Sequence, residues 1–292
     1  HTHSKQSSKR PRCDIYQRHR RNEKEVPNMA LVNIGYSSIS TTDSLMETLW
    51  SAEYNVVLER LLWLEVLKFH VSHGLAPLSA VDDYEKCRYQ VNLESITKRE
   101  LVTRHDVKAR IEEYNALAGH EYIHLGMTSA DVVDNTTLSR MNRSSALIID
   151  CYPPAKGILT ELPFRGIKGA VGTQQDQLTL LKNPDLCGDL DRAVAIGMKW
   201  SNHRNILGSV GQVYPRTLDL QWASQLFSLV AGIRDPRIAI AAGFLQMIAS
   251  YAGHQWNEGD VSNSVTRRVA IPAMANTVYE ILFAYKGSAV SE

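Results

Sequence analysis

Residues 56–69 read VVLERLLWLEVLKF, and this stretch decides the fold class. Its apolar side chains recur at helical spacing, with charged residues such as Glu59 and Lys68 between them. The pattern predicts one helix from Ser51 to Gly74, with Pro77 just beyond its end. Because the apolar face is wide, we expect this helix to be well buried.

Further helices follow from the same periodicity: Asp106–Ala118, Thr128 or Ser129 to Ile149, and Leu218–Gly232. Gly119 is the expected stop of the first, and its solvent-facing side is expected to carry Lys108, Arg110, Glu112 and Glu113. Thr128 and Asp131 have the spacing of a capping box. Strand-like alternation is scarce, so we predict an all-α protein, with turns in the Pro- and Gly-rich region 150–175.

Composition limits the class of protein. The chain has 292 residues, is 44% hydrophobic and carries a formal net charge of +1. These values indicate a soluble globular protein and argue against nucleic acid or a membrane as partner of the folded body. The most apolar stretch, Ile238–Gly253, is shorter than a membrane span, contains Gln246 and follows Arg237. We predict that it forms a buried helix.

The N-terminal region differs from the rest. Residues 1–24 are rich in Lys and Arg and lack apolar periodicity, so we predict a disordered basic tail over residues 1–40. Two interpretations stay open for residues 1–28. They are upstream, appended or variant-exon sequence before an ordinary start at Met29, which we favour, or a targeting or nucleic-acid-binding arm.

Cysteine usage favours a reduced compartment. Cys13, Cys87, Cys151 and Cys187 are scattered and form no C-x-x-C pair. We therefore expect an intracellular, cytoplasmic protein without a disulfide framework.

Two neighbouring stretches predict an anion site. Thr103–Lys108 reads TRHDVK and contains Arg104 and His105. His124–Asp131 reads HLGMTSAD and ends at the start of a predicted helix, whose free N–H groups and positive dipole end favour a carboxylate or phosphate. For Thr128 the plain alternative is an N-cap, which would coexist with anion binding. For an isolated His the plain alternative is a surface or capping residue.

These stretches resemble the adenylosuccinate lyase family of the fumarase/aspartase superfamily. Three more blocks match in the family's order: 166–173, 211–216 and 255–268. The resemblance implies an all-α, long-helix bundle of the superfamily type, shortened. It also implies an N-terminal helical domain over residues 41–127 and an incomplete central bundle domain over residues 128–292.

The implied activity is β-elimination of fumarate from adenylosuccinate to give AMP, and from the succinylated aminoimidazole carboxamide ribotide, in purine biosynthesis. It implies a nucleotide substrate, a cytoplasmic homotetramer, and no metal or organic cofactor.

The resemblance also implies residue roles. His105 would assist proton transfer, with His124 as a second catalytic candidate. Thr128 and Ser129 would hold the fumarate carboxylate. The remaining candidates would bind the phosphate, the leaving nitrogen or the succinyl and nucleotide parts: Arg104, Asp106, Lys108, Gln212, Arg216, Ser264 and Arg268.

The sequence also departs from the family. An H-x-x-x-A-Q-x-T-T block expected between Ile149 and Pro163 is missing, as is an S-S-x-M-P-x-K-x-N loop expected between Ala231 and Ala241. Many family members have Arg where this chain has Gly259, and we expect the small C-terminal family domain to be absent. Three explanations stay open: omitted segments, a shortened isoform or faulty gene model, or a non-catalytic structural or interaction relative. Nucleic-acid binding through the basic tail is a weaker third class of function.

Overall fold

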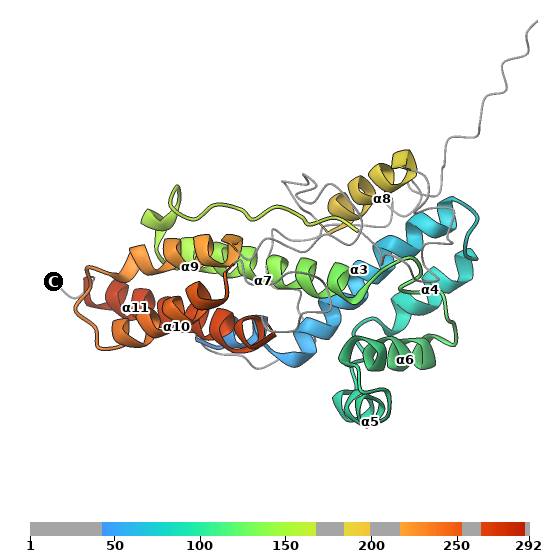
Figure 1. Cartoon of the computed structure of the whole chain (residues 1–292), viewed down its shortest axis with the longest axis horizontal. Helices are drawn as coiled ribbons and strands as arrows, with labels where there is room; N and C mark the ends of the chain where they lie inside the picture. Colours follow the sequence, from blue (N-terminus) through green and yellow to red (C-terminus); the bar gives the residue numbers. More distant parts are fainter. Residues whose placement is uncertain (1–42, 168–183, 199–216, 253–263, 290–292) are drawn as a thin grey trace, which may run out of the picture.

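The computed structural model describes residues 43–167, 184–198, 217–252 and 264–289 (Figure 1). Its α-helices are α2 Asp43–Leu49, α3 Ala52–Ser72, α4 Leu78–Cys87, α5 Leu93–Thr103, α6 Asp106–Ala118, α7 Ser129–Cys151, α8 Pro184–Gly197, α9 Thr217–Val230, α10 Ile238–Tyr251 and α11 Ile271–Ala289. A 3₁₀ turn covers Pro153–Ala155, and a π-helical turn, Thr266–Ala270, leads into α11. Within these ranges there is no β-strand, so the predicted all-α class is confirmed.

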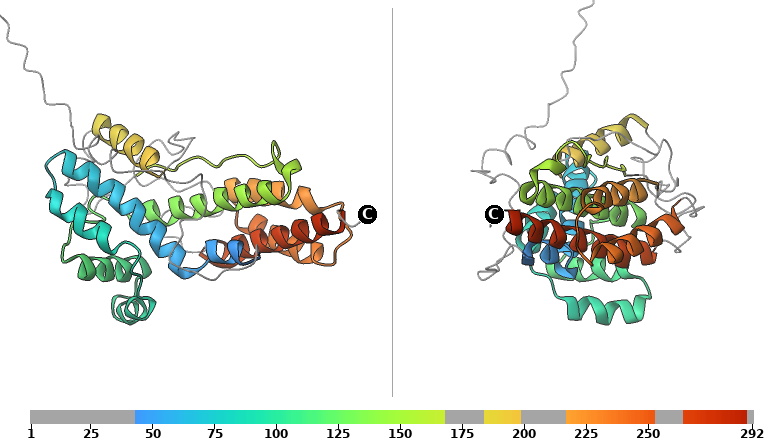
Figure 2. Two further views of the ribbon diagram at one scale, coloured as in Figure 1. Left: turned by 180° about the vertical axis from the view of Figure 1, so that it is seen from behind. Right: turned by 90° about the vertical axis from the view of Figure 1, so that its left-hand side faces the viewer.

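The described part of the molecule is elongated. Helices α7, α9, α10 and α11 lie lengthwise at one end, with α2 against α7 and α11 (Figure 1, Figure 2). Helix α3 runs from this bundle to the far end, where α4, α5 and α6 pack together and α8 lies against α3. The division of the chain at residue 127 stays a prediction.

Helix α3 is the buried axis that its sequence predicts. Ser51 caps its start by accepting the Tyr54 N–H at 3.1 Å. Apolar side chains on nearly every face of the helix are buried, including Trp63 and Leu62 at 0% exposure. This packing fixes the position of the polar side chains that α3 also carries.

Two residues predicted on the solvent-facing side of α6, Arg110 and Glu113, are largely buried. Glu113 on α6 is only 2% exposed and forms an ion pair with the fully buried Arg60 of α3. A buried guanidinium needs a carboxylate partner, and Glu113 supplies it. Periodicity placed Glu113 outside because the partner lies on another helix.

Two helix boundaries match their local signals. Gly119 ends α6 with φ +72°, a conformation that costs glycine little. Helix α7 begins after Thr128, whose N–H donates to Asp131 Oδ2 at 2.9 Å in the predicted capping box. Asp131 also receives a 2.6 Å hydrogen bond from Nη1 of the buried Arg165. The start of α7 is therefore tied to the extended segment that follows the helix.

The prediction of a buried helix over Ile238–Gly253 is wrong for a single chain. Helix α10 forms over Ile238–Tyr251, but only Ala241 and Ile248 are buried, and Ile240 is 53% exposed. It packs on α9 and α11 along one side, and no described helix covers the other. No helix in the described ranges is long and apolar enough to cross a membrane.

Several sequence predictions fall outside the described residues. These are the tail of residues 1–40, the end of the turn-rich region beyond residue 167, and most of the block 255–268. Gln212 and Arg216 lie outside them as well. Cys87 and Cys151 are buried free thiols.

Candidate functional site

Arg104 and His105 form the turn between α5 and α6. Arg104 takes a left-handed conformation, φ 54°, and its N–H donates to Glu100 O at 2.8 Å. His105 is the N-cap of α6, because its Nδ1 accepts the Lys108 N–H at 3.3 Å. The ring is half exposed, so Nε2 is left for a ligand. The capping role and a site role are compatible at this position.

Asp106, the first residue of α6, contacts a residue far along the chain. Its Oδ2 lies 3.0 Å from Nη2 of Arg268 and 3.2 Å from Nη2 of Arg110. Burial opposes ionisation of Asp106, but Arg110, the hydrogen bond from the Val107 N–H and then Arg268 outweigh it and hold the pKa of that carboxyl below its usual range. Asp106 is thus an anion that orients two guanidinium groups.

The Asp106–Arg268 pair lines a cavity of about 220 Å³. We call this cavity the arginine pocket; its lining is Trp50, Ser51, Ala52, Asn55, Asp106, Arg110, Arg140, Arg267, Arg268 and Pro272. Four segments meet there: the start of α3, the start of α6, the middle of α7, and the turn before α11. Four arginines face one carboxylate, so the lining carries an excess of positive charge.

The π-helical turn presents two of these arginines. Thr266–Ala270 contains Arg267 and Arg268 and inserts a wide turn before α11. Such turns are rare inside helices and occur frequently at functional sites. Ser264, predicted beside Arg268 as a phosphate ligand, lies two residues before this turn and is half buried.

The histidine of the second predicted stretch is held by a tryptophan. Trp63 Nε1 donates to His124 Nδ1 at 3.0 Å. Burial, with a smaller contribution from His105, lowers the pKa of His124 to about 4. The imidazole is therefore neutral near pH 7, with Nδ1 as acceptor and its proton on Nε2. In this state His124 is a hydrogen-bond donor toward a ligand rather than a strong base.

Not all the predicted residues come together. Arg140, in the pocket, lies eleven residues along α7 from Ser129, which corresponds to about 16 Å of helix. Thr128 and Ser129 therefore lie outside the pocket lining. Lys108 is exposed, with Nζ 4.0 Å from Glu112 Oε1. Of the predicted residues, Asp106 and Arg268 share the pocket, and His105 and His124 do not line it.

Sequence reasoning missed three arginines of the pocket. Arg110 reads as a solvent-facing residue of α6, but it is 12% exposed and its Nε pairs with Glu59 of α3. The sequence could have indicated Arg267 as a pocket residue, since it adjoins the predicted ligand Arg268. Arg140 has no local signal, because only the packing of α7 against the start of α3 brings it to Trp50.

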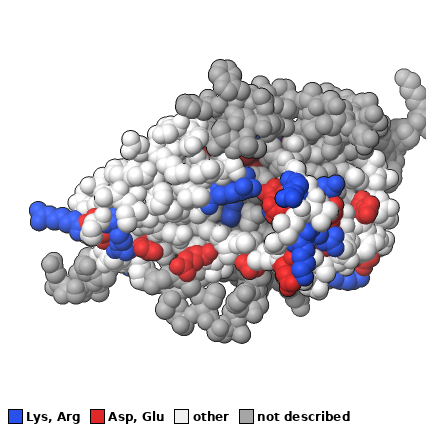
Figure 3. Space-filling view, turned by 60° about the horizontal axis from the view of Figure 1, so that its bottom comes forward, with Lys and Arg blue, Asp and Glu red and all other residues white. Residues whose placement is uncertain are grey.

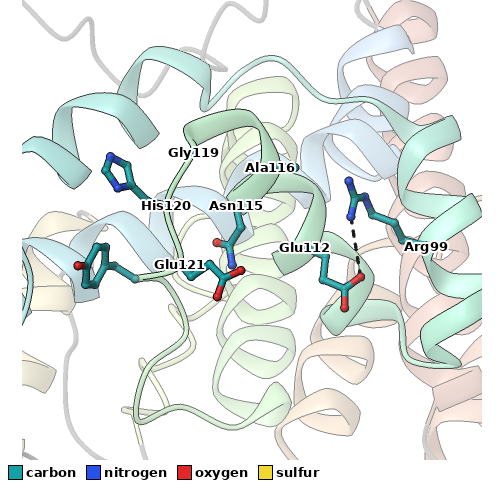
Figure 4. A pocket seen from close by; sticks show the side chains of 8 residues that line it. Arg99, Glu112, Asn115, Ala116, Gly119, His120 and Glu121 are labelled. Carbon is teal, nitrogen blue, oxygen red and sulfur yellow. Dashed lines mark ion pairs between the residues drawn. The ribbon is translucent and has the colours of Figure 1, made fainter.

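A second, larger cavity lies between α5, α6 and the segment that follows α6. It measures about 880 Å³ and is lined by residues such as Arg99, Glu112 and His120 (Figure 4). Two of its ionisable groups have partners: Arg99 lies 3.9 Å from Glu112, and His120 Nε2 lies 2.9 Å from Asp83 Oδ2. No group of His, Cys, Asp and Glu in the described ranges has the arrangement of a metal site.

The face of the molecule in Figure 3 carries basic and acidic side chains side by side. It shows no continuous basic field of the kind that binds nucleic acid through phosphates.

Some curated proteins are similar to this chain in sequence. No family model matches the chain. Adenylosuccinate lyase of Schizosaccharomyces pombe is 26% identical over 242 residues, covering 64% of this chain and 49% of that enzyme. Adenylosuccinate lyase of Methanocaldococcus jannaschii is 34% identical over 125 residues, covering 40% of this chain and 26% of that enzyme.

Solved structures share the fold. A 3-carboxy-cis,cis-muconate lactonizing enzyme from Pseudomonas putida matches with a TM-score of 0.66 at 13% identity, covering 88% of this chain and 76% of that one. A fumarate lyase from Mesorhizobium sp. BNC1 matches with a TM-score of 0.53 at 13% identity. The match covers 86% of this chain and 77% of that one. These similarities support a member of the fumarase/aspartase superfamily. The predicted helical bundle of the superfamily is confirmed, and the chain is shorter than its homologues.

The proteins similar to this chain are named for different reactions. The matched structures are named a lactonizing enzyme and a fumarate lyase, whereas the curated relatives are adenylosuccinate lyases. The matched region spans about half the length of the first of these relatives, 49%. The curated relatives are lyases, and the activity and substrate of this chain are matters for proposal.

Proposed function

We propose that this chain is an adenylosuccinate lyase-like protein, which eliminates fumarate from adenylosuccinate to give AMP and acts likewise on the succinylated aminoimidazole carboxamide ribotide. The observation that carries the proposal is the Asp106–Arg268 contact at 3.0 Å. It joins two of the sequence blocks that resemble the family, 162 residues apart, at one positively charged pocket. The named curated relatives support the same substrate.

The substrate carries a phosphate and two carboxylates, so its site needs several fixed cations and N–H donors. We assign the phosphate to the arginine pocket, with Arg268 and Ser264 as ligands. Thr128 and Ser129, at the start of α7, are assigned to the fumarate carboxylate. The distance of about 16 Å along α7 that separates them from Arg140 requires an extended ligand or the contribution of a second subunit.

The reaction needs two proton transfers. A base removes the proton from the carbon next to a carboxylate, and its electrons form the new double bond as the C–N bond breaks. An acid then protonates the departing nitrogen. We assign His105 to assist at the leaving nitrogen, because its Nδ1 is engaged as the α6 cap and Nε2 is left for substrate. His124 Nε2–H would donate a hydrogen bond, since its low pKa keeps the ring neutral.

The remaining roles rest on the resemblance. Arg104 and Lys108 would approach the phosphate from the α5–α6 turn, and Gln212 and Arg216 would orient the succinyl or nucleotide part. We further propose a cytoplasmic homotetramer, with the exposed side of α10 as one of its contacts. A non-catalytic structural or interaction relative is the second candidate, because the sequence lacks both family blocks that carry proton transfer.

Turnover tests the proposal. The conversion of adenylosuccinate to AMP is followed by absorbance for the 292-residue chain and for a longer form containing H-x-x-x-A-Q and S-S-x-M-P blocks. Each missing proton transfer removes roughly 10²- to 10⁴-fold in rate, so we expect negligible turnover by the 292-residue chain and clear turnover by the longer form.

In the longer form, His105→Ala should depress the rate and leave the circular dichroism spectrum unchanged. An inactive longer form would reject the lyase assignment and favour the non-catalytic relative. Robust turnover by the shorter chain would show that its acid and base lie among the residues present, with His105 and His124 the first to test.

A further inference from the structure

Arg140 stands out among the arginines of the pocket by its surroundings. It lies in the middle of α7, is only 8% exposed, and its Cζ lies 4.6 Å from the centroid of the Trp50 ring. Trp50 Nε1 in turn donates to Ser144 Oγ at 3.0 Å, one helical turn further along α7. The tryptophan is thus fixed against α7, and Arg140 is stacked on it in one orientation.

No carboxylate neutralises Arg140. It has no ion pair or hydrogen bond in the part of the chain that the structure describes, and its Nε is buried without a partner. Other buried arginines are paired: Arg60 with Glu113, and Arg165 with Asp131 and Asp134. Glu59, the acidic group with an electrostatic effect on Arg140, is held by Arg110.

The electrostatic surroundings agree with this geometry. Burial is the largest effect on Arg140 and lowers its pKa to about 10; Glu59 opposes the shift, while Arg267 and Arg110 add to it. The guanidinium remains charged at neutral pH, in a place where desolvation and like charges both disfavour it. A buried, unpaired cation is costly, so a ligand anion that occupied the pocket would relieve the cost.

We propose that Arg140, stacked on Trp50, is an anion-binding residue of the arginine pocket and contacts the phosphate of a nucleotide opposite Arg268. Stacking engages the face of the guanidinium and leaves its edge for paired hydrogen bonds to phosphate oxygens. The neighbouring Arg268 is already turned toward the pocket by Asp106. That the ligand is an anion follows from the pocket alone. That the anion is the phosphate of a nucleotide rests on the proposed function.

Calorimetry with AMP, adenosine and inorganic phosphate tests this role on the full 292-residue chain. Arg140→Met keeps much of the side-chain volume and removes the charge, so we expect AMP binding to weaken roughly 10- to 100-fold and adenosine binding to stay unchanged. The AMP affinity of Arg140→Lys should lie between that of the parent and that of Arg140→Met, because lysine keeps the charge and lacks the planar guanidinium fork.

The matched control is Arg143→Met. Arg143 lies on the same helix, three residues on, with its Nε bonded to Ser139 Oγ at 3.4 Å and its side chain outside the pocket lining. We expect it to leave AMP affinity within about twofold of the parent. Equal losses for Arg140→Met and Arg143→Met would show a general change of surface charge and overturn the proposal.

Thermal unfolding separates binding from a structural role. Without ligand, Arg140→Met should unfold at the same temperature as the parent or higher, because it removes an unpaired buried charge. Phosphate should raise the unfolding temperature of the parent and not of the variant. A ligand-free variant with a lowered unfolding temperature or an altered oligomeric state would assign Arg140 to structure or assembly and refute the proposal.

Failure of this inference differs from failure of the proposed function. Arg140-dependent binding of AMP or phosphate by a longer form that does not cleave adenylosuccinate would uphold Arg140 and reject the lyase. Normal turnover and AMP affinity in Arg140→Met would uphold the lyase and reject Arg140. A parent chain that binds neither AMP nor inorganic phosphate would refute the anion site itself.

Discussion

At the residue scale, the described structure depends on charged and polar side chains that the sequence pattern alone does not place. Glu59, Arg60 and Glu113 are buried, and each is matched by an opposite charge from another helix. His70 on α3 is different, since it is 2% exposed and neither ring nitrogen has a hydrogen-bond partner in the described ranges.

His70 makes stability depend on pH. Burial, with a smaller effect of His73, lowers the pKa of His70 to about 4, against 6.5 for a free histidine. Between these pH values the unfolded chain binds a proton that the folded chain does not, so stability is full above about pH 6.5 and falls as the pH drops toward 4. The loss amounts to about 3 kcal/mol for this residue.

We therefore expect His70→Phe to flatten the pH dependence of the unfolding free energy between pH 7 and 4, measured by urea denaturation. His73→Gln, on the exposed end of the same helix, is the control and should keep most of the dependence. A slope unchanged by His70→Phe would mean that His70 is protonated in the folded protein.

At the element scale, the sequence predicts the boundaries of α6 and the burial of α3, but not the exposure of α10. Helix α6 begins and ends at the predicted residues, because His105, Asp106 and Gly119 act within one turn of the chain. Helix α10 was predicted as buried from its apolar composition, yet much of its surface is exposed. The burial of α3 follows from its wide apolar face, whereas the burial of α10 depends on what packs against its second side, which its own sequence does not state.

The exposed side of α10 predicts self-association, because Ile240 is 53% exposed there and no described helix covers this side. Ile240→Glu should shift the chain to smaller species in sedimentation velocity at equal concentration. Leu101→Glu is the matched control, since Leu101 is 64% exposed on α5 at the far end of the molecule. A well-folded monomer in the parent chain, or equal effects of the two variants, would contradict the role of α10.

At the scale of the whole molecule, the arginine pocket exists only because four distant segments meet. The resemblance predicted Asp106 and Arg268 as ligands, and the fold places them 3.0 Å apart. It could not predict Arg140, since nothing in the sequence around that residue indicates Trp50 as its neighbour. The charge excess of the pocket is likewise a property of packing, given a net charge of only +1 for the chain.

The most direct measurement of the central claim compares AMP with adenosine by calorimetry on the unmodified chain. The two ligands share base and sugar and differ in the phosphate, so their difference in affinity reports the charge-assisted contacts of the arginine pocket. The account predicts that AMP binds at least about tenfold more tightly and that the preference shrinks as salt is raised. Equal affinities for AMP and adenosine would contradict it.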